Sequence, residues 1–108
     1  MIARLWTASA TPENTARYHD HFEQHVLAGI RRVPGYAGSS LYTRTIGSEV
    51  EIVVITRWQS IDAIRAFAGD DLERAVVAEA AVPLLTRWDR RVHHCDVVFE
   101  SVTGESGE

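Results

Sequence analysis

The chain has 108 residues, of which 45% are hydrophobic, and its formal net charge is −4 at pH 7. This length suits one domain with a modest core, so self-association would help it to bury apolar surface. The acidic balance contains no run of Lys or Arg, which argues against nucleic-acid binding. No stretch is long and apolar enough to cross a bilayer, so a membrane role is not expected.

The N-terminus and the cysteine content indicate the compartment. The first residues turn polar by Thr7, so they do not form the apolar core of a secretory signal. The single cysteine, Cys95, cannot form an internal disulfide, which fits a reducing compartment. We therefore expect a soluble, cytoplasmic protein.

The first third of the chain predicts a strand followed by a long helix. Residues 2–8 are short and apolar, as in a strand. Thr11 can cap a helix with Pro12 at its first position, and the apolar spacing extends this helix over 12–32. Gly35 then helps to end it.

A hairpin and a broken second helix come next. Strands are predicted at 39–46 and 50–58, separated by a Gly-Ser turn. Ser60 can cap the second helix, which Gly69 interrupts. A further helical piece is predicted at 71–80 from its apolar spacing.

The last strand is predicted at 91–100, so the order of elements is β-α-β-β-α-β. This order is typical of the ferredoxin-like α+β fold, a four-stranded antiparallel sheet with helices on one face. We expect one domain over residues 1–100 and a polar, mobile tail over 101–108.

Both faces of the predicted strands carry apolar side chains. Val54 and Trp58 lie on one face of the strand at 50–58, and Val53 and Ile55 lie on the other. Helices can cover only one face, and a large bare apolar face would aggregate. We therefore expect a homodimer in which two sheets pack face to face. The alternative is that strands are simply rich in β-branched residues.

Several segments resemble the antibiotic biosynthesis monooxygenase family within the dimeric α+β barrel superfamily. They are MIARLW at 1–6, VPGY at 33–36, WQSIDAIRAFAG at 58–69 and WDRRVHHCDVV at 88–98. The resemblance covers nearly the whole chain except its tail and implies a dimeric α+β barrel. The family includes cofactor-free oxygenases of polycyclic aromatic substrates, heme-degrading enzymes and members without a known activity.

The resemblance does not extend to the heme-degrading members. These carry Asn where Ala3 stands, Trp where Phe67 stands and a heme-ligating His near Val77, and this chain has none of the three. We therefore expect no heme, and no other cofactor, because no dinucleotide loop, phosphate loop or nucleophile elbow is present.

Histidines cluster in the predicted first helix. His21 and His25 lie one turn apart on the same edge, whereas His19 lies on the opposite edge. A zinc site needs at least a third ligand, and none is evident. A solvated histidine pair is the favoured interpretation, so no metal is expected.

His93 and His94 are neighbours on the last predicted strand, so they point to opposite faces. Only one of them can enter a cleft between the helices and the sheet. The resembled family usually has His at the position of His94, which makes His94 the candidate general base. A core histidine held by one hydrogen bond is the alternative.

Four aromatic residues are candidates for the walls of a binding site, because flat ligands pack against rings. They are Tyr42, Trp58, Phe67 and Trp88. Ordinary core packing is the alternative for the tryptophans and an exposed hairpin position for Tyr42. The sequence thus predicts a cofactor-independent monooxygenase, or a related polyketide-modifying catalyst, of a small aromatic or polyketide-like substrate. A non-catalytic protein that binds a small apolar ligand is the alternative, because a fold does not determine a function.

Overall fold

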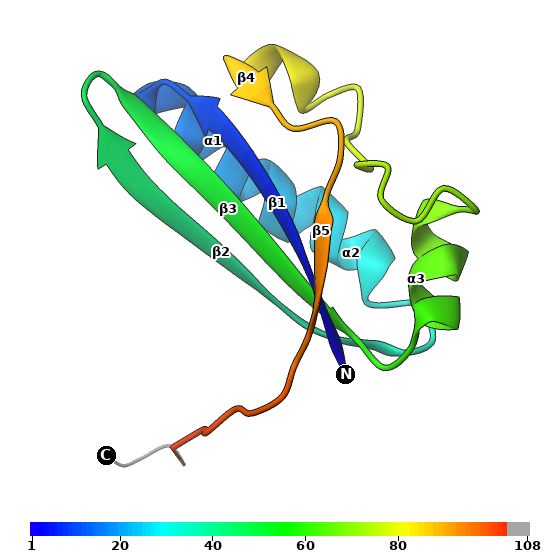
Figure 1. The fold of residues 1–108 in the computed structure, drawn as a ribbon. Helices are drawn as coiled ribbons and strands as arrows, with labels where there is room; N and C mark the ends of the chain where they lie inside the picture. The colour runs from blue at the N-terminus through cyan, green and yellow to red at the C-terminus, as the bar shows by residue number, and fades with distance from the viewer. Residues whose placement is uncertain (104–108) are drawn as a thin grey trace.

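The computed structural model describes residues 1–103. Five strands and a set of helical segments follow one another along the chain (Figure 1). They are β1 (Ile2–Ala10), α1 (Pro12–His21), the π-helical turn η1 (Phe22–Val26), α2 (Leu27–Ile30), β2 (Tyr36–Ile46), β3 (Glu49–Trp58), α3 (Ile61–Ala68), the 3-10 turn η2 (Val82–Leu84), β4 (Arg87–Trp88) and β5 (His93–Asp96). The predicted mobile tail falls largely outside the described residues.

The strands form one antiparallel sheet in the order β2-β3-β1-β4, with β5 also paired to β1. β4 pairs with the end of β1 at Ala8 and Ser9, and β5 pairs with its beginning. Two short strands therefore share one edge of the sheet. The helices lie on one face (Figure 1), so the predicted ferredoxin-like α+β fold is confirmed.

The predicted first helix is present as three helical segments that continue one another, α1, η1 and α2. The Thr11 hydroxyl accepts a hydrogen bond from the Asn14 amide at 3.1 Å, as expected of an N-cap. The π-helical turn was not predicted, because an inserted residue of this kind leaves no clear signal in the apolar spacing. Ser60 caps α3 in the same way, through the Ala63 amide.

The prediction of a helix at 71–80 is wrong. This segment, here called the strap, is irregular. The Ala75 amide donates to the Arg90 carbonyl at 2.9 Å, and the Val92 amide donates to the Glu73 carbonyl at 2.8 Å. The backbone of the strap thus closes single turns, such as that from the Arg74 amide to the Asp71 carbonyl, and pairs with the segment before β5 instead of forming a continuous helix.

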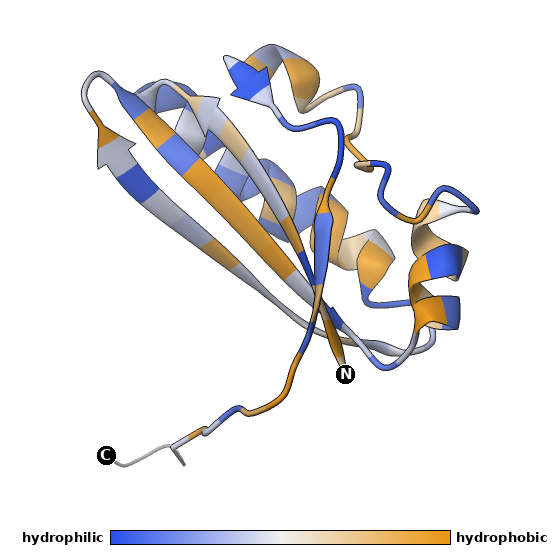
Figure 2. Cartoon of the chain, in the orientation of Figure 1, coloured by the Kyte–Doolittle hydropathy of each residue, from blue (hydrophilic) through white to orange (hydrophobic). Residues whose placement is uncertain are grey.

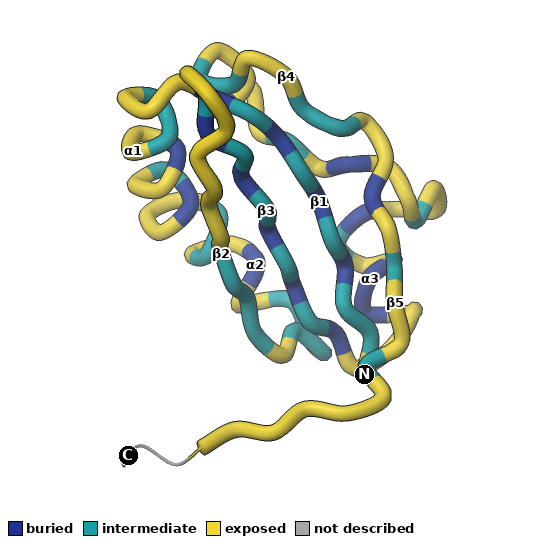
Figure 3. Tube along the Cα trace, turned by 60° about the vertical axis from the view of Figure 1, so that its left-hand side comes forward, coloured by how far each residue is buried: buried dark blue, intermediate teal, exposed yellow. Residues whose placement is uncertain are grey.

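The predicted strand at 91–100 is shorter than expected and ends at Asp96. The following residues leave the body of the domain, and Figures 1 and 3 show them as an exposed arm. Val98 and Phe99 are 92% and 80% exposed, so the apolar side chains of the arm are bare in the single chain.

The core lies between the sheet and the helices. Buried and half-buried residues alternate along β1 and β3 (Figure 3), and the buried ones, such as Trp6, Ile52 and Trp58, face the helices. Val53 and Ile55 point to the other face, here called the open face, and are half-buried. Figure 2 shows the hydrophobic residues along β3 and along the arm. Among the described residues, no helix is long and apolar enough to cross a membrane.

Candidate functional site

A cleft lies between the helices, the sheet and the strap. It has a small inner chamber of about 60 Å³ and a larger, more open outer chamber of about 260 Å³. The two adjoin each other, because several side chains line both. These shared residues are Val26, Ile30, Phe67, Val76, Val77 and Ala78. The outer chamber is apolar, whereas polar side chains reach only the inner one.

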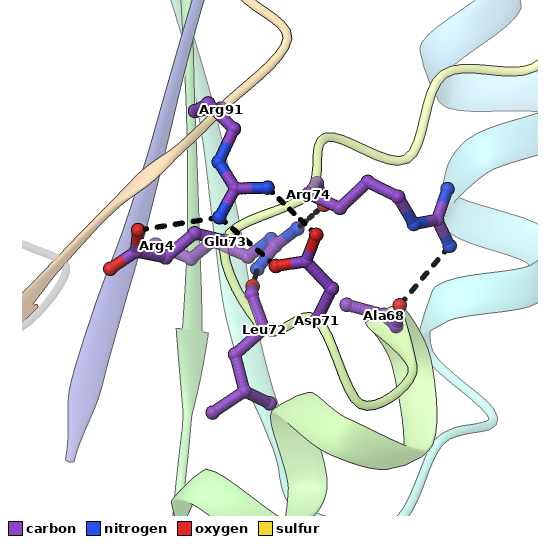
Figure 4. A network of polar contacts seen from close by, with 7 residues as sticks. All are labelled: Arg4, Ala68, Asp71, Leu72, Glu73, Arg74 and Arg91. Carbon is purple, nitrogen blue, oxygen red and sulfur yellow. Dashed lines mark hydrogen bonds and ion pairs between the residues drawn. The ribbon is translucent and has the colours of Figure 1, made fainter.

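Arg4 is the charged residue of the inner chamber, and it is 4% exposed. It enters from β1, where strand alternation turns it to the same side as Trp6. Its guanidinium donates to the carbonyl oxygens of Leu72 at 2.6 Å and Arg74 at 2.7 Å (Figure 4), which fastens the strap to the sheet. Its centre lies 5.6 Å from the Phe67 ring.

Burial, and then the charge of Arg74, lower the pKa of Arg4 to about 10. Arg4 therefore remains a cation at neutral pH. Within residues 1–103, no carboxylate forms an ion pair with it. The inner chamber thus contains a buried positive charge whose contacts are neutral groups.

The outer side of the strap is fastened by ion pairs. Arg91 binds both carboxylate oxygens of Asp71, at 2.7 and 3.0 Å, and lies 3.6 Å from Glu73 (Figure 4). The hydrogen bond from Arg91 is the main cause of a lowered pKa of Asp71. The carboxylates of Asp71 and Glu73 therefore face Arg91 rather than Arg4.

His21 is the histidine that lines the inner chamber. Its Nε2 atom is buried and has no hydrogen-bond partner within the described part of the chain. Burial, and then the charge of His25, lower the pKa of His21, so the neutral ring is favoured. The rings of His21 and His25 are 5.5 Å apart, and no group of three residues among 1–103 could hold a metal ion.

His94 lies behind Arg4. The two residues are opposite each other in the pairing of β1 with β5, and His94 Nε2 is 2.9 Å from Arg4 Nη1. A guanidinium can only donate, so this imidazole nitrogen accepts and the ring is neutral. Burial, followed by the charge of Arg4, lowers the pKa of His94, and Glu73 opposes the shift. His94 does not line either chamber, and His93 is exposed on the other face.

Of the four predicted wall residues, one lines the two chambers and the other three lie elsewhere. Phe67 lines both chambers. Trp58 is fully buried behind it, with the two rings stacked at 5.3 Å. Trp88 lies outside the cleft with the Arg90 guanidinium 3.8 Å above its ring. Tyr42 is 57% exposed on the open face.

Arg4 and His21 line the inner chamber but were not predicted from the sequence as site residues. The alternation of β1 could have placed Arg4 beside Trp6 on the core face. The spacing from Tyr18 could likewise have placed His21 near the buried side of the first helix. Neither pattern could show that the side chain ends in a cavity, because the strap and α3 form the rest of its wall.

Two of the three positions at which heme-degrading members of the family differ from this chain lie at the cleft. Phe67 and Val77 line the cleft, whereas Ala3 alternates with Arg4 and points to the open face. Position 3 therefore has no bearing on this cleft. Val77 offers no ligand for iron, so the residues present do not fit heme by the family pattern.

The fold and the cleft define the chain as a small ferredoxin-like α+β domain with an apolar cleft between its helices and its sheet. The family model of antibiotic biosynthesis monooxygenase matches residues 1–79. The chain therefore belongs to the antibiotic biosynthesis monooxygenase family, as its sequence resemblance predicted. None of the curated proteins matches it.

Solved structures share the fold at low sequence identity. The heme-degrader MhuD of Mycobacterium tuberculosis, with two hemes bound, is 21% identical over 94% of this chain and 100% of its own, with a TM-score of 0.64. A Bacillus cereus protein assigned to the antibiotic biosynthesis monooxygenases is 16% identical over 93% and 97%, with a TM-score of 0.65. The monooxygenase from the gene ActVA-Orf6 of Streptomyces coelicolor, in complex with nanaomycin D, is 19% identical over 97% and 92%, with a TM-score of 0.58.

Proposed function

We propose that the protein is a cofactor-independent monooxygenase, or a related polyketide-modifying catalyst, that binds a small aromatic or polyketide-like substrate in the cleft. The observation that carries the proposal is an apolar cleft whose inner end bears a buried cation and a bare neutral imidazole. Family membership supports it. The ligands of two relatives, heme and nanaomycin D, support a flat ring system as the occupant.

The chemistry needs a base and a dry, oriented site. A neutral imidazole removes the proton of a phenol, and the phenolate gives electrons to dioxygen. One phenol and one O₂ then yield one quinone and one water, with four electrons coming from the substrate, so no further reductant is required. The protein would supply orientation, exclusion of water and the proton acceptor.

Two neutral imidazoles are candidates for the base. His94 is the candidate from the sequence, and it would have to release its hydrogen bond from Arg4 before it could take a proton. His21 is the one that lines the inner chamber. Oxygen consumption with hydroxynaphthalenes and hydroxyanthracenes tests the activity. If His94 is the base, His94→Phe should bind the substrate and turn over at least about 100-fold more slowly. Unchanged turnover would leave the reaction in place and exclude His94 from it.

A binding or accessory role is the second candidate, and the small inner chamber favours it. About 60 Å³ leaves little room for a ring together with dioxygen. Tight binding of hydroxynaphthalenes without any uptake of oxygen would support this role over catalysis.

We also propose that two chains form a homodimer through their open faces. Half-buried Val53 and Ile55 on that face support this arrangement. The bare apolar side chains of Val98 and Phe99 on the arm support it as well, because exposed apolar groups of this size commonly mark an interface. A cytoplasmic location is proposed from the free thiol of Cys95.

A further inference from the structure

We propose that Arg4 and His21 form an anion site at the inner end of the cleft, which selects flat aromatic molecules bound through a negatively charged oxygen. The inference deepens the proposed function, because it names the class of substrate. It concerns binding, so it can be tested whether or not the protein consumes oxygen.

The charge of Arg4 has no counter-charge among the described residues. A buried cation is costly unless an anion compensates it. Arg4 contacts two carbonyl oxygens and one neutral imidazole, and Arg74 adds a second positive charge nearby. The carboxylates of Asp71 and Glu73 are directed to Arg91. A bound anion would therefore supply the compensation that residues 1–103 do not.

Arg4 and His21 retain hydrogen-bonding capacity that a ligand can use. A guanidinium has five N–H donors, and three of them make the hydrogen bonds from Arg4 to Leu72, Arg74 and His94. Two donors are left for a ligand oxygen. His21 adds the bare Nε2 atom, which can accept a proton or a hydrogen bond from a ligand hydroxyl. The same chamber thus offers donors, a charge and an acceptor.

The two chambers of the cleft differ in size and polarity. The inner chamber has room for only a few water-sized groups, since one water needs about 10–15 Å³ on this measure. The outer chamber is more than four times larger, about 260 Å³ against 60 Å³. It is lined by apolar side chains, including Phe67 and Val33. A ligand therefore fits with its charged oxygen inward and its rings outward.

A matched pair of probes tests the charge preference. We would titrate the protein with 2-naphthoate and with 2-naphthamide, which have nearly the same shape but differ in charge, and follow tryptophan fluorescence, since Trp6 lines the chamber. The anion should bind the wild type at least about tenfold more tightly. Equal affinities in the wild type would overturn the proposal.

Substitutions of Arg4 test whether this residue causes the preference for the anionic probe. Arg4→Gln should remove it, whereas Arg4→Lys should retain a preference for the anion because the charge remains. The control His93→Gln changes an exposed histidine that lines neither chamber, so its preference should equal that of the wild type. Retention of the full preference by Arg4→Gln would contradict the role of Arg4. If Arg4→Gln does not fold, the ratio of the affinities for 2-naphthoate and 2-naphthamide, measured in the wild type and in Arg4→Lys, decides whether the proposal holds.

The role of His21 has a separate readout. The absorbance of bound 4-nitrophenol reports how much phenolate forms at a given pH. The wild type should ionise the bound phenol below its solution pKa, and His21→Phe should lose part of this shift while it keeps the affinity for 2-naphthoate. An unchanged shift would exclude His21 from the site. A clear anion preference without oxygen uptake would refute only the oxygenase, and oxygen uptake without the preference would refute only the anion site.

Discussion

The hydrogen bond between Arg4 and His94 makes the stability of the domain depend on the protonation state of His94. The imidazole must stay neutral to accept the hydrogen bond, and burial lowers its pKa in the folded state. The unfolded chain takes up a proton at His94 near pH 6.5, while the folded chain resists it. Stability from this group is therefore present above about pH 6.5 and is lost as the pH falls through the folded pKa. The lowered pKa of His21 acts in the same direction.

We expect the free energy of unfolding to fall as the pH is lowered from about 7.5 to about 5.5. His94→Gln keeps an acceptor but no longer titrates, so its stability should depend less on pH. His94→Phe leaves a buried donor of Arg4 without a partner and should lose about 1–3 kcal/mol at neutral pH. Urea unfolding at both pH values measures these effects. Parallel pH profiles for the wild type and His94→Gln would show that His94 is not the titrating group.

At the scale of elements, the strap closes the cleft without regular structure of its own. Arg4 holds it from the inside, and Arg91 holds it from the outside through Asp71 (Figure 4). The outer pair is exposed, and such pairs contribute little to global stability. Its effect should therefore be local and should concern how often the strap opens.

We expect Asp71→Asn to speed the amide hydrogen exchange of Ala75 and Val92, whose hydrogen bonds join the strap to the segment before β5. The midpoint of global unfolding should change little. Asp70→Asn is the matched control, since Asp70 directly precedes the strap but is fully exposed and lies 3.7 Å from Arg65. Equal exchange rates in the two variants would show that the outer ion pair does not hold the strap.

At the scale of the whole molecule, the open face and the arm are the surfaces that a single chain leaves incomplete. β3 turns Val53 and Ile55 to this face, and the arm leaves the body with Phe99 exposed. We expect the wild type to have twice the chain mass in light scattering at micromolar concentration. Ile55→Glu places a charge on the proposed interface and should give a monomer.

The control for this prediction is Thr43→Glu. Thr43 is exposed on the neighbouring strand and points to the other side of the sheet, because it is opposite Ile52 of the buried face. The Thr43→Glu variant should therefore remain a dimer. A wild type that is monomeric, or an Ile55→Glu variant that is still dimeric, would contradict the proposed assembly.

Local sequence determined most of the fold. Thr11 and Ser60 set helix starts through hydrogen bonds to amides three residues ahead, so no distant contact is needed. Gly69 can end α3 because its backbone has φ 88°, which other residues rarely adopt. Alternation in β3 showed which residues face each side of the sheet. These features depend on neighbours in the chain, and their prediction was correct.

Only the tertiary structure decided the strap and the site. The apolar spacing of 71–80 is compatible with a helix, but hydrogen bonds to Arg4 and to the segment before β5 take its backbone groups instead. The same folding puts His21 in the chamber and His94 behind Arg4. Composition and periodicity determined a ferredoxin-like domain with two apolar sheet faces. Which polar groups end in the cleft, and which lack a counter-charge, depends on contacts between residues about 70 to 90 positions apart, and no local pattern encodes them.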